Sequence, residues 1–271
     1  RCWWCSVSNG LNGANGASNG AEGSGEGYAM HSIERIYPPD LDPASPGDQN
    51  TLHIHLERYE FAAHHLRGEQ VLDMACGCGY GSALLAERHP DKQVTGVDID
   101  PAAIAYARQH YQLPNLRYVC ADAESFAATQ RFDSIVSLET IEHLPNPRQL
   151  VANYARLLAV GGRVIASVPI TPTLDGNPHH LHDFSRRSFL ALFRHHRLRP
   201  ETQELEQIQW WQFRGLFSRR PDHAKRHRSE GVGNAVLNYY RHHPTYLLAR
   251  LASMLRYGFS NRYLTCLFIA E

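Results

Sequence analysis

Residues 71–79 read VLDMACGCG, and this stretch decides the fold class of the chain. A short apolar run that passes into glycines at alternate positions is typical of a buried strand followed by a sharp turn into a helix. Glycine also lets the backbone of such a turn approach a ligand closely. Many turns are rich in glycine, so the segments around this one must indicate what it binds.

Strand-like and helix-like segments alternate on both sides of this turn. Strands are predicted over residues 70–75, 93–97, 116–120, 134–138, 163–168, 202–211 and 264–270. Helical spacing predicts helices over residues 52–66, 82–88, 101–111, 148–158, 189–193 and 234–256, the last interrupted by Pro244. This alternation predicts a mostly parallel sheet with helices on both faces. Ligands of such sheets bind beyond the carboxyl ends of the strands.

Two acids stand at those strand ends. Asp98 closes the second predicted strand, where an acid accepts hydrogen bonds from ribose hydroxyls in nucleotide-binding sheets. Asp122 follows the third predicted strand and is placed to bind an adenine amino group. The sequence therefore predicts a nucleoside lying across the strand ends.

The 71–79 turn, Asp98 and Asp122 together resemble class I S-adenosylmethionine-dependent methyltransferases. A glycine pair at 161–162, before the fifth predicted strand, resembles the same family. The resemblance covers about residues 52–168 and the last predicted strand, and the branch is that of glycan, natural-product and quinone O-methyltransferases. It implies a Rossmann-like α/β fold with a mostly parallel seven-stranded sheet and a helical insertion before the last strand.

A nicotinamide-binding enzyme is the alternative interpretation of the turn. Those enzymes carry the spacing G-x-G-x-x-G. Here Gly77, Gly79 and Gly81 follow the spacing G-x-G-x-G, and Asp73 precedes them. This arrangement is closer to the methyltransferase pattern.

The family resemblance implies S-adenosylmethionine as cofactor, with Asp73 near its amino group, Asp98 at its ribose and Asp122 at its adenine. Residues 55–62, HLERYEFA, also resemble a helix that covers the cofactor in one branch of the family. An ordinary amphipathic helix is the alternative for that segment. The implied cofactor-binding set is Arg58, Tyr59, Asp73, Ala75, Gly77, Gly79, Asp98, Ile99, Asp122, Ala123 and Glu139.

The segment after the fourth predicted strand, residues 137–145, reads SLETIEHLP and is the candidate for acceptor activation. Glu139, Glu142 and His143 stand at i, i+3 and i+4, which predicts that they share one face of a helical turn. Methyl transfer is a displacement at carbon, so the protein must orient the acceptor and remove its proton. In one interpretation His143 is the general base and Glu142 orients its ring.

In the other interpretation, Glu139, Glu142, His143 and His180 bind Mg²⁺ or Mn²⁺, which lowers the pKa of the acceptor. The set resembles metal ligands of quinone-ring O-methyltransferases and small-RNA 3′-end methyltransferases. The same Glu-His-Leu-Pro run occurs in class I methyltransferases that use no metal. Residues 177–185, NPHHLHDFS, further resemble methyltransferases of sugars and surface glycans. Both interpretations stay open.

Composition and charge limit the acceptor. The 271 residues are 43% hydrophobic with a net charge of +0, which excludes wholesale disorder and any global attraction to nucleic acid. Basic residues nevertheless outnumber acidic ones after Arg186. Aromatic side chains at Trp210, Trp211, Phe213 and Phe217 lie near arginines and would stack on a sugar or a base. We rank a glycan, natural-product or lipid-linked acceptor above RNA.

The domain organisation follows composition. Residues 1–50 are predicted to form a Gly/Asn-rich flexible tail and approach segment, and residues 51–271 a methyltransferase domain with a helical insertion at about 213–260. No apolar run reaches the ~20 residues of a membrane span. We expect a cytoplasmic protein with at most peripheral membrane contact. Cys2 and Cys5 form an isolated C-x-x-C pair. The oligomeric state is not indicated.

The sequence thus predicts a methyltransferase that modifies a sugar, lipid-linked glycan or natural-product hydroxyl, with or without a divalent metal. One alternative is a small-RNA 3′-end 2′-O-methyltransferase. The other is a non-catalytic binding protein on the same fold.

Overall fold

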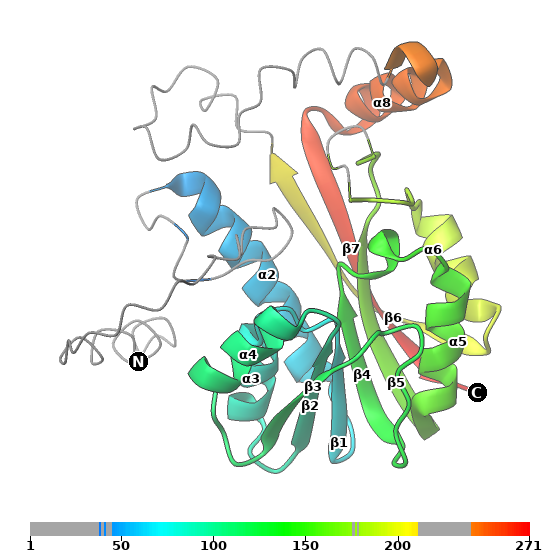
Figure 1. Cartoon of the computed structure of the whole chain (residues 1–271). Helices are drawn as coiled ribbons and strands as arrows, with labels where there is room; N and C mark the ends of the chain where they lie inside the picture. The colour runs from blue at the N-terminus through cyan, green and yellow to red at the C-terminus, as the bar shows by residue number, and fades with distance from the viewer. Residues whose placement is uncertain (1–37, 39–40, 42–44, 175–176, 178, 211–239) are drawn as a thin grey trace. The chain divides into compact units, whose positions relative to one another are not determined.

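The computed structural model describes residues 38, 41, 45–174, 177, 179–210 and 240–271. Within this part of the chain the backbone forms one seven-stranded sheet (Figure 1). The strands are β1 (Gln70–Met74), β2 (Gln93–Asp98), β3 (Leu116–Cys120), β4 (Phe132–Leu138), β5 (Leu158–Pro169), β6 (Leu198–Trp210) and β7 (Ser260–Ala270). Their order is β3-β2-β1-β4-β5-β7-β6. Strands β1 to β5 pair in parallel, and β7 is antiparallel to both its neighbours.

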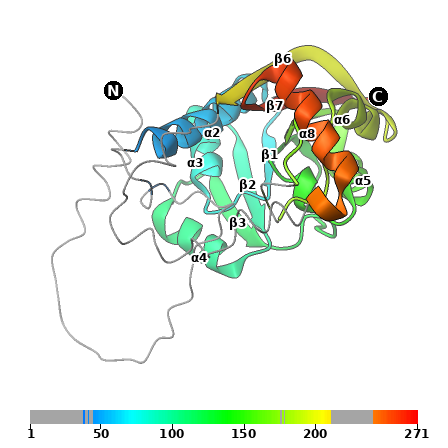
Figure 2. The ribbon, with the colours of Figure 1, turned by 90° about the horizontal axis from the view of Figure 1, so that it is seen from above.

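Helices cover both faces of this sheet, with α2, α3 and α4 on one side and α5 and α6 on the other (Figures 1 and 2). Their bounds are α2 (Pro46–His65), α3 (Tyr80–Arg88), α4 (Pro101–His110), α5 (Pro147–Leu157), α6 (Arg186–Arg194) and α8 (Pro244–Tyr257), with a 3₁₀ helix η2 (Ile141–His143). The predicted fold class, including a helix inserted before the last strand, is confirmed.

Local capping chemistry sets several helix starts. The side chains of Asp100 and Asn146 accept hydrogen bonds from backbone N–H groups in the first turns of α4 and α5. Ser185 and Ser188 form a capping box at α6. Helix α2 begins at Pro46, six residues before the predicted start, because Ser45 serves as its N-cap. The apolar spacing used for the prediction does not register such a polar first turn.

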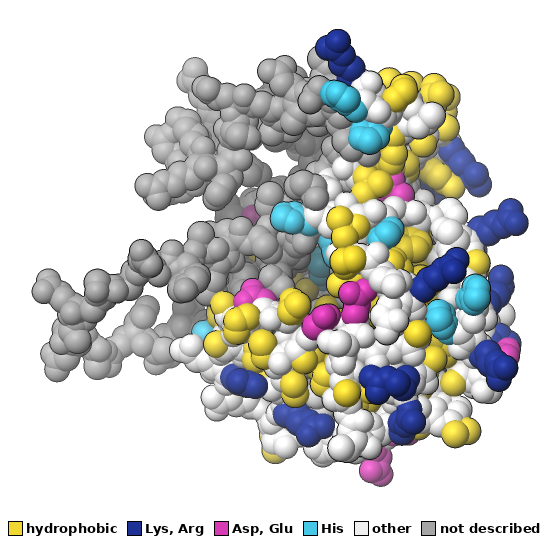
Figure 3. Space-filling view, turned by 45° about the vertical axis from the view of Figure 1, so that its right-hand side comes forward, with side chains coloured by type: hydrophobic (Ala, Val, Ile, Leu, Met, Phe, Trp, Pro, Cys, Tyr) yellow, Lys and Arg dark blue, Asp and Glu magenta, His cyan; other side chains and the backbone are white. Residues whose placement is uncertain are grey.

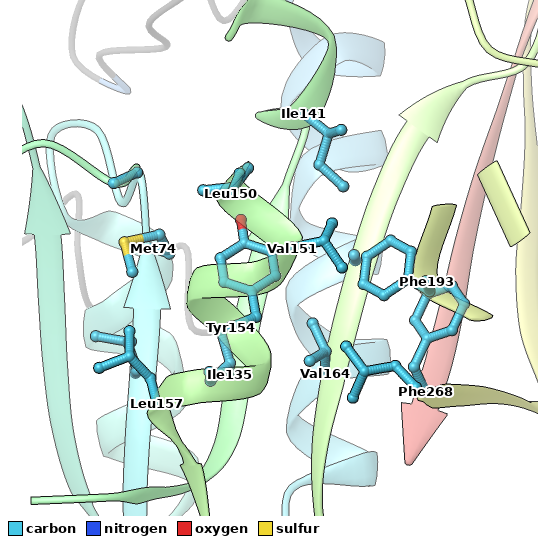
Figure 4. Close-up of a cluster of buried hydrophobic side chains, with 14 of the residues drawn as sticks. Met74, Ile135, Ile141, Leu150, Val151, Tyr154, Leu157, Val164, Phe193 and Phe268 are labelled. Carbon is cyan, nitrogen blue, oxygen red and sulfur yellow. The ribbon is translucent and has the colours of Figure 1, made fainter. Parts of the chain in front are cut away.

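The main core lies between the sheet and helices α5 and α6 (Figure 4). Tyr154 of α5 and Phe193 of α6 are fully buried there with Val164 of β5. The rings of Phe193 and Phe268 stack with centroids 3.7 Å apart. Burying side chains of this size stabilises the fold by roughly 1.5–3 kcal/mol each. The packing fixes α6 against β5 and β7, and so holds the ends of the segment that joins β5 to α6.

Helix α8 contrasts with the other helices because Arg250 is its one buried residue among those described. Leu248 and Leu255 are 67% and 90% exposed, and hydrophobic side chains gather over this helix (Figure 3). In the described part of the chain no helix combines the length and apolarity needed to cross a membrane. The Cys2/Cys5 pair, the 1–37 tail, and Trp211, Phe213 and Phe217 with the basic run near them lie outside the described residues.

Candidate functional site

The glycine turn leaves β1 where the strand order reverses, between β1 and β4. Ligands of open α/β sheets bind at such a switch point, beyond the strand ends. Ala75, Gly77 and Gly79 all have positive φ, at 61°, 57° and 89°. The left-handed conformation costs a non-glycine residue roughly 1–2 kcal/mol, so the turn at Ala75 is strained. The turn then runs directly into α3.

The two glycines of the turn have different surroundings. A Cβ on Gly79 would lie 2.6 Å from Cβ of Ala107 and 2.8 Å from the hydroxyl of Tyr118. A Cβ on Gly77 would meet no atom within 4 Å. Gly79 is therefore required by packing, whereas Gly77 faces open space at the strand ends.

Asp98 is tied to the same turn. Its Oδ2 accepts a hydrogen bond from the Gly77 N–H at 2.9 Å, and its Oδ1 accepts one from the Asp100 N–H at 2.9 Å. Asp122 accepts from the Glu124 N–H at 2.9 Å and so closes the turn after β3. Ile99, beside Asp98, is 62% exposed, which leaves an apolar surface next to the acid. Ala123 is buried.

Asp73 lies at the end of β1 and is almost fully buried. Ser82 of α3 donates a hydrogen bond to its Oδ2 at 2.6 Å, and the Tyr59 hydroxyl lies 3.4 Å from both carboxylate oxygens. Burial raises the pKa of Asp73 to about 7, although both hydrogen bonds oppose that rise. The Tyr59 ring covers Gly81, where a Cβ would lie 1.9 Å from ring atoms. The sequence offered no sign that Ser82 supports the acid.

Arg58 of α2 is 1% exposed and contacts strands β6 and β7 of the sheet. Its Nε donates to Gln207 Oε1 at 2.8 Å, and its guanidinium lies over the Tyr263 ring at 4.4 Å. Its Nη1 is buried and makes no hydrogen bond within the described structure, with Glu139 Oε1 at 3.7 Å as its ion-pair partner. Gln207 and Tyr263 were missed by the sequence reasoning, because nothing local in β6 or β7 marks them.

Glu139 does not share a helical turn with Glu142 and His143, and the geometry predicted from their spacing is wrong. Helix η2 begins at Ile141, and Glu139 precedes it with a positive φ of 49°. Its backbone N–H donates to Ser167 Oγ at 2.9 Å, and that hydroxyl donates to Glu139 Oε1 at 2.7 Å. These bonds turn Glu139 toward β5 and Arg58.

Glu142, His143 and His180 do come together. One ligand atom from each lies within 4.8 Å of the others. Glu142 is fully buried, and its Oε1 is 3.9 Å from His143 Nε2. The His143 and His180 rings meet edge to face with centroids 4.6 Å apart. The backbone carbonyl of Glu142 accepts from the Leu181 N–H at 2.8 Å, which fixes the β5–α6 segment beside η2.

A series of hydrogen bonds holds the His180 ring in place. Its Nδ1 is 2.6 Å from Thr173 Oγ1, and Thr173 donates to Asp183 Oδ1 at 3.1 Å. The Tyr246 hydroxyl of α8 donates to Asp183 Oδ2 and accepts from the Leu174 N–H at 2.9 Å. Burial lowers the pKa of His180 to about 4, with His143 and His179 adding to the effect. The ring is therefore neutral near pH 7.

Strand order, the glycine turn and the acids at the strand ends define a class I methyltransferase fold. Residues 72–166 match the family model described as a methyltransferase domain. The predicted resemblance to class I S-adenosylmethionine-dependent methyltransferases is confirmed, and the matched segment is 95 of the 271 residues.

Two curated methyltransferases are similar to part of the chain. The ubiquinone biosynthesis O-methyltransferase of Coxiella burnetii is 39% identical over 105 residues, which are 38% of this chain and 44% of the relative. The phthiotriol/phenolphthiotriol dimycocerosates methyltransferase of Mycobacterium leprae is 30% identical over 129 residues, 47% of this chain and 48% of the relative. The chain thus spans less than half the length of either curated relative.

A solved structure supports the same fold. The N-methyltransferase NodS from Bradyrhizobium japonicum, in complex with S-adenosyl-L-homocysteine, aligns with a TM-score of 0.53 at 15% identity. The alignment covers 84% of this chain and 89% of that chain. It therefore extends well beyond residues 72–166, into the region that contains β6, α8 and β7.

Proposed function

We propose that this chain is an S-adenosylmethionine-dependent methyltransferase that acts on a hydroxyl of a small-molecule or lipid-linked acceptor. The observation that carries the proposal is the open space at Gly77, where an added Cβ would meet no atom within 4 Å at the strand switch point, beside Asp98. The methyltransferase-domain match over residues 72–166 supports the reaction class.

The residues present fit this cofactor. Its amino-acid end carries both an ammonium and a carboxylate group, and the site offers both signs of charge. Asp73 and Glu139 are acids at the ends of β1 and β4, and Arg58 Nη1 is a buried donor that makes no hydrogen bond within the described structure. A carboxylate would satisfy that donor. When bound, the cofactor supplies a methyl group activated by a positively charged sulfur.

His143 is the group that we assign to the acceptor's proton. Its Nδ1 lies 3.3 Å from the His179 carbonyl oxygen, which accepts only, so the proton sits on Nδ1 and the lone pair on Nε2. Nε2 faces Glu142 Oε1 at 3.9 Å, and a buried carboxylate stabilises the ring once it is protonated. His143 therefore takes the hydroxyl proton, and the charge of Glu142 favours the protonated ring.

The same cluster supports a second candidate feature, a divalent ion that lowers the pKa of the acceptor hydroxyl. Glu142, His143 and His180 would hold it, because two imidazoles and one carboxylate are a donor set for transition metals. Thr173 can take the Nδ1 proton of His180 in a hydrogen bond, which leaves the His180 Nε2 lone pair for the ion. Glu139, the remaining predicted ligand, lies toward Arg58 instead.

The two curated relatives support methyl transfer to oxygen and an apolar acceptor. One relative is an O-methyltransferase of ubiquinone biosynthesis, and the other acts on phthiotriol and phenolphthiotriol dimycocerosates. The exposed apolar residues of α8 are compatible with an acceptor of that kind. A sugar or glycan acceptor, the RNA alternative and a cytoplasmic location stay predictions.

The test is methyl transfer from labelled S-adenosylmethionine to separate lipid, small-molecule and short RNA fractions. We expect label in the lipid or small-molecule fraction. Label in RNA alone would select the 3′-end methyltransferase, and no transfer together with no uptake of S-adenosylhomocysteine would contradict the proposal. Activity that a chelator removes and Mn²⁺ or Mg²⁺ restores supports the ion, whereas full activity in excess chelator leaves His143 as a metal-free base.

A further inference from the structure

The hairpin of β6 and β7 holds Arg58 from two directions. Gln207 of β6 and Tyr263 of β7 are direct cross-strand partners in the sheet register. Gln207 Oε1 accepts from Arg58 Nε at 2.8 Å, and the Tyr263 ring lies beneath the guanidinium plane at 4.4 Å. The hydrogen bond to Gln207 sets the direction in which the guanidinium points, and the Tyr263 ring sets the orientation of its plane.

Gln207 is itself immobilised. Its side chain is buried, and its Nε2 donates to the Ile54 carbonyl at 3.0 Å and to Glu57 Oε2 at 2.8 Å. Both of those partners only accept, so the amide orientation is determined: the oxygen must face Arg58. The amide cannot turn over without losing three hydrogen bonds.

Arg58 Nη1 is at the other end of the guanidinium from Nε. Because Nε donates to Gln207, Nη1 is the atom that points toward Glu139. It is buried and lies 3.7 Å from Glu139 Oε1, beyond hydrogen-bond distance. Burying a charged donor without a hydrogen bond costs free energy, and such a donor is tolerated where a bound ligand accepts a hydrogen bond from it. The anion that completes it must be compact and able to accept from a single N–H, as a carboxylate does.

We propose that Gln207 is a positioning residue that holds Arg58 so that Nη1 binds the carboxylate at the amino-acid end of the cofactor. This inference rests on the proposed function. Gln207 lies 149 residues from Arg58 in the sequence and outside the matched segment 72–166. The cofactor's carboxylate is therefore bound by an α2 side chain whose geometry is set by the C-terminal hairpin.

The test compares two ligands by calorimetry on the full chain: S-adenosylhomocysteine and its decarboxylated analogue, which keeps the ammonium group. Gln207→Leu removes the acceptor for Arg58. We expect it to weaken S-adenosylhomocysteine about tenfold, the value of one charge-assisted hydrogen bond, and to leave the analogue within about twofold. Gln203→Leu, an exposed glutamine of the same strand, is the matched control and should change neither affinity.

Two outcomes overturn the inference alone: equal weakening of both ligands, which means a general structural effect, or no weakening of either. A wild-type chain that binds neither ligand overturns the proposed function and the inference with it. If Gln207→Leu melts at a markedly lower temperature, Gln207→Met takes its place. Its thioether fills a similar volume without a strong acceptor for Arg58 Nε, so it should also weaken S-adenosylhomocysteine and leave the affinity for the analogue unchanged.

Discussion

Gly77 and Gly79 share a left-handed backbone but differ in what lies near their Cα atoms. We expect Gly79→Ala to destabilise the fold by about 2–4 kcal/mol, since its Cβ adds a clash with Ala107 and Tyr118 to the backbone strain. Gly77→Ala meets no atom, so it should cost only about 1 kcal/mol of strain while weakening S-adenosylhomocysteine strongly. Urea denaturation and calorimetry measure the two effects. Equal loss of stability in the two variants would contradict the distinction.

His143 belongs to the acceptor cluster and not to the glycine turn. His143→Ala should therefore lower methyl transfer by about 10²–10⁴-fold, the usual contribution of a general base or metal ligand, and leave the affinity for S-adenosylhomocysteine within about threefold. Labelled-methyl transfer and calorimetry test the split. Comparable loss of cofactor binding would show that His143 lies against the cofactor instead. His195→Ala, at the C-cap of α6, is the control histidine.

Single residues differ in how far the sequence marks them. Asp98 and Asp122 could be predicted as binding residues because each stands at the end of an apolar strand, and strand ends are where such sheets bind ligands. Ser167 and Gln207 were missed because a serine or glutamine in a strand looks the same whether it faces solvent or holds a functional side chain. Their roles depend on neighbours that the sheet brings from distant segments.

Elements show a different kind of error. The i, i+3, i+4 spacing of Glu139, Glu142 and His143 suggested one helical face, yet only the last two lie in η2. The hydrogen bonds between Glu139 and Ser167 of β5 outweigh the local helical preference and draw Glu139 into a left-handed conformation. Spacing alone cannot register a competitor from another strand.

Among the described contacts, Tyr246 links helix α8 to the residues that support His180. Tyr246→Phe removes the hydroxyl that joins α8 to Asp183 and to the Leu174 N–H. We expect faster hydrogen exchange of the helix and of the Leu174 amide, with little change in β1 to β5. Tyr257→Phe, at the other end of the helix, keeps its ring contacts with Arg256 and Arg262 and is the control. Unchanged exchange in the Tyr246→Phe variant would show that other contacts hold α8.

Asp73 should make a pH-dependent contribution to the stability of the whole molecule. Burial raises its pKa from 3.8 to about 7, so between those values the folded chain keeps a proton that the unfolded chain has released. Raising the pH through this window therefore removes the stability that this proton contributes, by up to about 4 kcal/mol. In Asp73→Asn this loss should be absent. Urea denaturation at several pH values between about 4 and 7 measures the difference between the two proteins.

Two buried histidines make that comparison necessary. Burial lowers the pKa of His55 from 6.5 to about 3 and that of His180 from 6.5 to about 4, so the contribution of each to stability rises with pH over most of the same window. These slopes oppose that of Asp73 in the wild-type chain. Asp73→Asn should therefore gain stability with pH more steeply than the wild type, and parallel curves for the two proteins would contradict the raised pKa. Asp91→Asn, at the surface, should follow the wild type.

The sequence by itself determined the alternation of strands and helices, the glycine turn after β1 and the acids at the strand ends. These features depend on hydrophobic period and on backbone preferences, which act between residues close in the chain. Only the tertiary structure decided that Gln207 holds Arg58, that Ser167 turns Glu139 away from His143, and that Tyr246 reaches the support of His180. Each of those contacts joins segments that become neighbours through the order of the strands, and no local preference encodes that order.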